Sequence, residues 1–102
     1  MHAPDLLKVL NSAAAPLVID VRSSMEYQSG HIPGAVHVSV LKILLRLDRL
    51  SAYRQRQLVV TCEHGPRAQL ARSVLARSGH LNPDLLEGHM ADWRQAGMPL
   101  EK

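Results

Sequence analysis

The sequence predicts an α/β fold, with a small, mostly parallel sheet flanked by helices on both faces. Short apolar runs at 17–21, 35–38, 58–60 and 85–86 are expected to be the strands, and helical patterns separate them. The run at 58–60, Leu-Val-Val, contains no polar residue, which is typical of a strand buried on both faces. Strands that alternate with helices favour parallel pairing, because each parallel connection needs a crossover segment.

The N-terminal half contains two expected helices. The first covers 4–10, with Pro4 near its start and leucines on one face. The second covers 23–28, because Ser23 and Glu26 have the spacing of a capping box.

Three more helices are expected after residue 40. One lies between residues 41 and 50, where leucines recur. Its inner face would hold Leu41, Leu44, Leu45 and Leu50, and its outer face Lys42, Arg46 and Arg49. Another covers 68–78, after the central strand. Gly88 turns the chain into the last helix, in which Met90 and Trp93 are expected to pack in the core.

Composition indicates one globular domain of 102 residues, with a core from about 6 to 100. The hydrophobic content of 46% and the charged content of 21% are ordinary for such a domain. A net charge of +3 favours small anionic substrates. Nucleic acid is not an expected partner, because the arginines are scattered and only three residues are aromatic.

Cys62 is the only cysteine, so it cannot form an internal disulfide, and a free thiol suits the reducing cytoplasm. The N-terminus lacks the pattern of a signal peptide. No stretch approaches the ~20 apolar residues of a membrane span. We therefore expect a cytoplasmic protein without a membrane partner.

The chemistry is expected at the loop that joins the central strand to the following helix, where open α/β sheets bind ligands. This loop consists of Cys62, Glu63, His64, Gly65, Pro66 and Arg67. A helix N-terminus and nearby positive charge lower the pKa of a thiol from its usual ~8.5. Backbone N–H groups of a curled loop would stabilise an anionic sulfur. Gly65 permits the curl, Pro66 cannot donate, and Arg67 can bind an anion bidentately.

Cys62 is therefore a candidate nucleophile. The alternative is a small buried hydrophobic residue, as free cysteines often are. The catalytic interpretation requires that the sulfur meet inward-facing loop amides, and it loses its physical basis if the side chain is sealed inside the core. His64 either tunes the thiolate or faces solvent. A metal site at Cys62 and His64 is disfavoured, because the other histidines lack paired ligand spacing.

Asp20 and Arg22 are expected to form a buried ion pair, or hydrogen bonds that pin the turn at 30–35, rather than to contact substrate. Glu26 lies four residues after Arg22 and is expected to pair with it.

Three segments in order resemble the rhodanese (thiosulfate sulfurtransferase) family. The first contains Asp-Val-Arg at 20–22, Glu-Tyr at 26–27 and Gly-His-Ile-Pro-Gly-Ala at 30–35. The second is the Cys62 loop with its helix. The third contains Leu-Glu-Gly at 86–88, Trp93 and Gly-Met-Pro at 97–99.

This resemblance implies a rhodanese-like fold and an active-site loop from Cys62 to Arg67. In the family, the cysteine takes a sulfane sulfur from a donor such as thiosulfate, and the resulting persulfide passes it to a thiol or to cyanide. The implied partners are a small anionic sulfur donor and a thiol acceptor, either a small molecule or a thioredoxin-like protein. No metal or organic cofactor is implied.

Two residues depart from the family pattern. Glu63 follows the nucleophile where thiosulfate-using relatives often have a basic residue, so it would oppose a dianionic donor and favour another persulfide. His89 follows Gly88 where the family commonly has a second glycine, which is expected to alter only the turn into the last helix.

Two other functions stay open. A non-catalytic binding or regulatory module of this family is disfavoured by the intact loop. A Cys-dependent phosphatase or arsenate reductase is disfavoured by loop length, because four residues separate Cys62 from Arg67 and phosphatases have five. Arg67 is therefore not expected to act as a phosphatase arginine.

Overall fold

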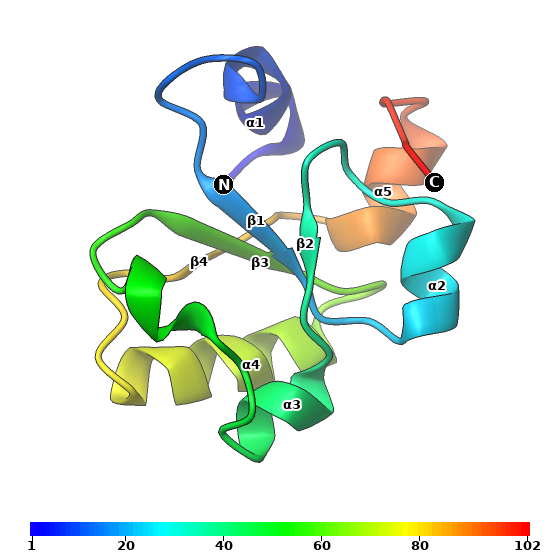
Figure 1. Cartoon of the computed structure of the whole chain (residues 1–102). Coiled ribbons are helices and arrows are strands. Elements are labelled where there is room, and N and C mark those ends of the chain that lie inside the picture. Colours follow the sequence, from blue (N-terminus) through cyan, green and yellow to red (C-terminus); the bar gives the residue numbers. More distant parts are fainter.

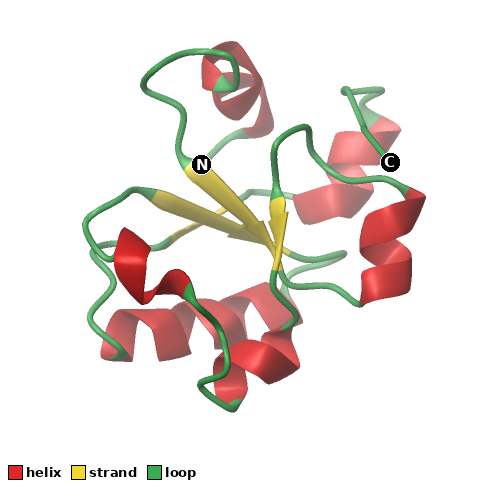
Figure 2. Ribbon diagram, viewed as in Figure 1, coloured by secondary structure: helices red, strands yellow, loops and turns green.

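The computed structural model describes residues 1–102, and its four strands form one parallel sheet in the order β2-β1-β3-β4 (Figures 1 and 2). The strands are β1 (Leu17–Asp20), β2 (Val36–His37), β3 (Leu58–Thr61) and β4 (Asp84–Leu85). All three pairings are parallel, with β1 and β3 at the centre. The predicted strands and their parallel arrangement are confirmed.

Helices cover both faces of the sheet, as predicted (Figure 1). The helices are α1 (Ala3–Val9), α2 (Ser24–Ser29), α3 (Val40–Leu44), the 3-10 helix η1 (Leu50–Tyr53), α4 (Pro66–Arg77) and α5 (His89–Gln95). One face packs against α3, η1 and α4, and the other against α1 and α5. No helix is both long enough and apolar enough to cross a membrane.

The central strands supply both cores through the two-residue alternation of strand side chains. Ile19 and Val60 belong to the core under α4, whereas Val18 and Val59 belong to the core under α1 and α5. Trp93 lies fully buried in the second core beside Met90, as predicted. Each core thus draws on the same two central strands, so the strand ends are held firmly on both sides.

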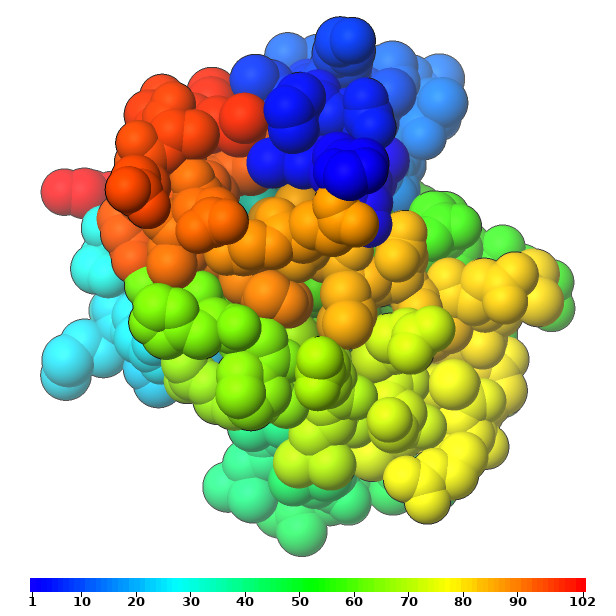
Figure 3. Space-filling model, turned by 180° about the vertical axis from the view of Figure 1, so that it is seen from behind, coloured from blue at the N-terminus to red at the C-terminus, as the bar shows by residue number.

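The N-terminus packs against the segment that leads into α5. Seen from behind, the N-terminal residues lie against the segment that leads into α5, while α4 forms the opposite side (Figure 3). The Glu87 N–H donates to the Met1 carbonyl at 2.9 Å, and the Met1 ammonium group lies 3.2 Å from Asp84. These contacts hold the segment from Asp84 to Glu87, which leads into α5.

A helix is present in the predicted segment between residues 41 and 50, but it is shorter than predicted and buries a different residue. The helix α3 ends at Leu44, and Arg46 has a left-handed backbone with φ of 59° that turns the chain toward η1. Leu41 and Leu45 are 60% and 58% exposed, and Ile43 is the buried residue of α3. Ser39 caps the helix by accepting the Lys42 N–H, and Ile43 rather than the leucines packs in the core.

The predicted ion pair between Asp20 and Arg22 is confirmed, and it is 0% and 2% exposed. Arg22 donates through Nη2 to Asp20 Oδ2 at 2.8 Å and to the Gly30 carbonyl, also at 2.8 Å. The pair therefore joins the end of β1 to the turn that follows α2.

The predicted pairing of Glu26 with Arg22 is wrong, because Glu26 pairs with Arg67 instead. Arg67 donates from Nη1 and Nη2 to the two Glu26 carboxylate oxygens at 2.7 and 3.0 Å. The capping box of Ser23 and Glu26 is confirmed, so one carboxylate both caps α2 and ties it to α4. The hydrogen bond from Arg67 lowers the pKa of Glu26 to about 2, although partial burial opposes this shift.

We predict that Asp20→Ala lowers the free energy of unfolding by about 3 to 5 kcal/mol, because it leaves the Arg22 charge buried without a partner. Urea denaturation measures this. The double variant Asp20→Ala/Arg22→Met removes both charges and should recover part of the loss. A single variant within 1 kcal/mol of wild type would contradict a structural ion pair.

We predict that Glu26→Gln costs less than about 1 kcal/mol at neutral pH, because Arg67 and Glu26 are 38% and 34% exposed and solvent screens the pair. Since the folded pKa of Glu26 is depressed from 4.5 to about 2, its contribution is fully present above pH 4.5 and disappears as pH falls toward 2. Denaturation of both proteins across that range measures the difference. A difference that grows on acidification would contradict the pairing.

Candidate active site

Cys62 lies at the carboxyl end of β3, directly before the loop that leads into α4. In the strand order β2-β1-β3-β4, β1 and β3 are neighbours at the centre of the sheet. The connection after β1 leads to one edge of the sheet and the connection after β3 leads to the other, so Cys62 lies where the direction of the strand order reverses. Such a switch point is where open parallel sheets bind ligands. Gly65 has φ of 126°, a conformation that side chains rarely adopt, and it curls the loop back so that α4 begins at Pro66.

The sulfur of Cys62 accepts two backbone hydrogen bonds. The Gly65 N–H donates to Sγ at 3.0 Å and the Ala68 N–H at 3.4 Å. Pro66 has no N–H to offer. The N-terminus of a 12-residue helix therefore points at the sulfur, where its dipole favours negative charge. The arrangement can stabilise an anionic sulfur through the main chain alone.

The side chain of Cys62 is nevertheless fully buried, at 0% exposure, and it packs with Ile19, Val60 and Ala71 in the core under α4. Of the two conditions set for the catalytic interpretation, the inward-facing amides are present, but the side chain is closed off inside the core, as the alternative of a buried hydrophobic residue predicts. A reagent reaches the sulfur only if the loop moves.

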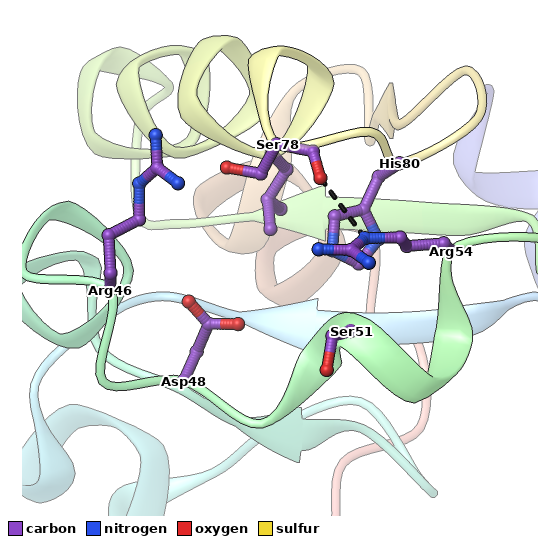
Figure 4. Close-up of a pocket in the computed structure, with 7 residues that line it drawn as sticks. Arg46, Asp48, Ser51, Arg54, Ser78 and His80 are labelled. Carbon is purple, nitrogen blue, oxygen red and sulfur yellow. Dashed lines mark hydrogen bonds between the residues drawn. The ribbon is translucent and has the colours of Figure 1, made fainter.

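Neither surface hollow reaches Cys62. The first, of about 210 Å³, lies between the segment after α3 and the C-terminal end of α4 (Figure 4). It is lined by Arg46, Asp48, Ser51, Arg54, Leu75, Ser78 and His80. The second, of about 240 Å³, is lined by Gln57, Arg72, Asn82, Pro83 and Asp84. Both lie near the amino ends of β3 and β4, whereas Cys62 follows the carboxyl end of β3.

The charged loop residues face other protein groups. The guanidinium of Arg67 is held by Glu26, so it does not point at the sulfur. The Glu63 carboxylate pairs with Arg22 Nη1 at 3.4 Å and with Arg94 of α5. Partial burial opposes ionisation, but the hydrogen bond and charge of Arg94, with the charge of Arg22, lower the pKa of Glu63. His64 is exposed and makes no hydrogen bond.

The structure adds one residue that the sequence interpretation missed. His89, the first residue of α5, is only 8% exposed and reaches the start of the loop. Its Nδ1 accepts the Cys62 N–H at 3.3 Å and lies 3.3 Å from Thr61 Oγ1. The position after Gly88 stood out in the sequence, but nothing there showed that the ring turns toward Cys62.

A known protein family matches nearly the whole chain. The family model for the Rhodanese-like domain matches residues 3–96. The HTH-type transcriptional regulator Rv0324 of Mycobacterium tuberculosis is 33% identical over 86 residues, which are 83% of this chain and 37% of that protein. The chain therefore spans little more than a third of that relative. The thiosulfate sulfurtransferase GlpE of Pseudomonas savastanoi is 32% identical over 94 residues, 89% of this chain and 83% of that enzyme.

Solved structures show the same fold. A rhodanese-related protein from Thermoplasma volcanium superposes with a TM-score of 0.81 at 26% identity, over 99% of this chain and 95% of that one. A protein from Rhodopseudomonas palustris, described as a possible tyrosine phosphatase, gives 0.81 at 26% identity, over 98% of this chain and 82% of that one. Because the family model matches residues 3–96 and GlpE is 32% identical over 89% of this chain, the chain belongs to the Rhodanese-like domain family.

Proposed function

We propose that this chain is a sulfurtransferase in which Cys62 carries a sulfane sulfur as a persulfide. The observation that carries the proposal is the pair of backbone N–H groups, from Gly65 and Ala68, directed at Sγ. A persulfide is anionic, and main-chain donors at a helix N-terminus suit such a group. The family membership and the similarity to GlpE support the same chemistry.

In the first step, the Cys62 thiolate attacks the outer sulfur of thiosulfate. A sulfur–sulfur bond forms to Cys62, the bond between the two thiosulfate sulfurs breaks, and sulfite leaves with the electron pair. The total charge of −3 is the same on both sides. Loop amides would then face the anionic terminal sulfur, which is where negative charge collects.

In the second step, an acceptor thiolate attacks the terminal sulfur and forms a new sulfur–sulfur bond, and the Cys62 thiolate leaves. Cyanide can take the same place and leave as thiocyanate. The acceptor would be a small thiol or a thioredoxin-like protein in a reducing compartment such as the cytoplasm, where Cys62 stays reduced. No side chain near Sγ needs to transfer a proton in either step.

The loop favours this reaction over phosphatase chemistry. A phosphatase loop needs an arginine free to bind the equatorial oxygens of phosphate. Here Arg67 makes a bidentate pair with Glu26, and the loop has only four residues between Cys62 and Arg67. The two backbone N–H groups, from Gly65 and Ala68, thus face a single sulfur atom.

The burial of Cys62 favours a second candidate, a binding module without catalysis, because no hollow leads to the sulfur. Catalysis therefore requires the loop at 62–67 to open. The side chains of His64 and Pro66 in this loop are already exposed, so opening does not have to pull them out of the core. A sulfurtransferase must take up a sulfur atom on Cys62, whereas a binding module need not. Uptake of sulfur by Cys62 therefore distinguishes the two functions.

We predict that thiosulfate adds the mass of one sulfur atom to the intact protein, at Cys62 only, and that added cyanide removes it as thiocyanate. Cys62→Ser, which keeps the size of the side chain, should show neither event. Intact-mass analysis and thiocyanate determination measure the two steps. No adduct with thiosulfate or any persulfide donor would favour the binding module, and Cys62-dependent turnover of an aryl phosphate would favour the phosphatase.

We predict that Arg94→Ala raises the KM for thiosulfate about threefold to tenfold. The variant leaves Glu63 with one cation instead of two, and a dianionic donor then meets additional negative charge worth ~1 kcal/mol. Steady-state kinetics at low salt measures this. The double variant Glu63→Gln/Arg94→Ala restores the charge balance and should return KM close to wild type. Equal KM values in all three proteins would show that Glu63 does not sense the donor.

A further inference from the structure

His89 occupies a backbone position that favours glycine. Its φ of 51° lies in the left-handed region, which is strained for a residue with a side chain and free of strain for glycine. The residue before it, Gly88, is also left-handed with φ of 77°. The backbone conformation therefore gives no reason for a histidine at this position. The reason has to be sought in the contacts of the imidazole ring.

Those contacts hold the first peptide group of the active-site loop. The Cys62 N–H donates to His89 Nδ1 at 3.3 Å. The next two residues of α5 also bind the loop. The Met90 N–H donates to the Cys62 carbonyl at 3.0 Å, and the Ala91 N–H donates to the Glu63 carbonyl at 3.1 Å. The start of the loop is thus bound to the first turn of α5 on both its donor and its acceptor side.

The other edge of the ring supports the curl of the loop. A methyl group placed on Gly65 would lie 3.3 Å from His89 Nε2, so the ring packs directly against this glycine. The N–H of the same glycine points at Sγ. One side chain therefore contacts both the peptide that precedes the sulfur and the glycine whose amide faces it.

We propose that His89 is a positioning residue for Cys62: its neutral ring accepts the Cys62 N–H and backs Gly65, so that the loop amides stay directed at the sulfur. This inference rests on the proposed function of Cys62 as sulfur carrier. His89 does not touch the reacting atoms, and it acts through the loop.

The role requires an unprotonated Nδ1, since a protonated ring is a donor at both nitrogens. Burial lowers the pKa of His89 below its usual 6.5, the Asp92 carboxylate on α5 opposes this, and His64 of the loop and the Met1 ammonium group add to it. The backbone N–H of Cys62 and the hydroxyl of Thr61 from β3 also face Nδ1. The ring is therefore neutral at pH 7.

The sign of the pH effect follows from that direction. Because the folded pKa lies below the unfolded one, the contribution of His89 is fully present above pH 6.5 and is lost as pH falls through the folded value. Acidification removes the acceptor of the Cys62 N–H and loosens the loop.

Two variants test the inference. His89→Asn keeps an acceptor near the place of Nδ1, tolerates a left-handed backbone and does not titrate. His89→Gly removes the acceptor and relieves the backbone. We expect His89→Gly to stay folded, because relief of the left-handed backbone offsets part of the lost contacts, and to form the persulfide about tenfold more slowly at pH 8, as for the loss of one hydrogen bond. His89→Asn should stay within about threefold of wild type.

A second readout does not depend on sulfur transfer. In ¹⁵N NMR spectra recorded from pH 8 to 5, the Cys62 amide should follow the same titration as the His89 ring, and His89→Asn should abolish it. His2→Asn, which changes an exposed ring beside Glu87, should leave it intact. A Cys62 amide that ignores the His89 titration, or a His89→Gly variant as fast as wild type, overturns the inference. A wild-type chain that shows the shared titration but takes up no sulfur contradicts the proposed function and supports the hold of His89 on the loop.

Discussion

The site depends on backbone N–H groups that have no carbonyl partner. The first turn of any α-helix carries such donors, and at the start of α4 they would be buried against the sheet. Cys62 Sγ takes two donors at this corner, the N–H groups of Gly65 and Ala68. The sulfur and the helix end therefore satisfy each other, and an anionic sulfur would satisfy them better than a neutral thiol. This single requirement explains why a buried cysteine here is more than a small apolar residue.

The charges around the loop are paired with one another, which leaves the main chain as the free source of positive potential. Arg67 is engaged by Glu26, Arg22 by Asp20, and Glu63 lies between Arg22 and Arg94. An arginine free to move toward an anion would compete with the amides and widen the range of ligands. Pairing each charge instead keeps the loop tight around one atom, in keeping with sulfur rather than with a tetrahedral oxyanion.

Local signals in the sequence predicted much of this arrangement. The apolar run of β3, the glycine that curls the loop and the capping box at Ser23 all act within a few residues, so their patterns are legible in the chain. The errors concern distant partners. Glu26 and Arg67 are 41 residues apart, and His89 lies 27 residues from Cys62, so no spacing rule joins them. The leucines at 41–45 also gave a wrong inner face, because Ile43 is the residue of α3 that packs in the core.

The closed loop also shows what sulfur transfer would demand of it. The Gly65 amide nitrogen lies 3.0 Å from Sγ, in direct contact with it, so no space remains between them. A second sulfur would sit about 2 Å beyond the first, the length of a sulfur–sulfur bond. The loop must therefore expand by a similar amount, and the Gly65 amide that faced Sγ would then face the terminal sulfur. Its two ends are anchored, by α5 at Cys62 and Glu63 and by Glu26 at Arg67, so the movement falls on residues 64–66 between them. The Gly65 amide would thus serve the thiolate in the closed loop and the persulfide in the expanded one, while the Ala68 amide stays fixed in α4.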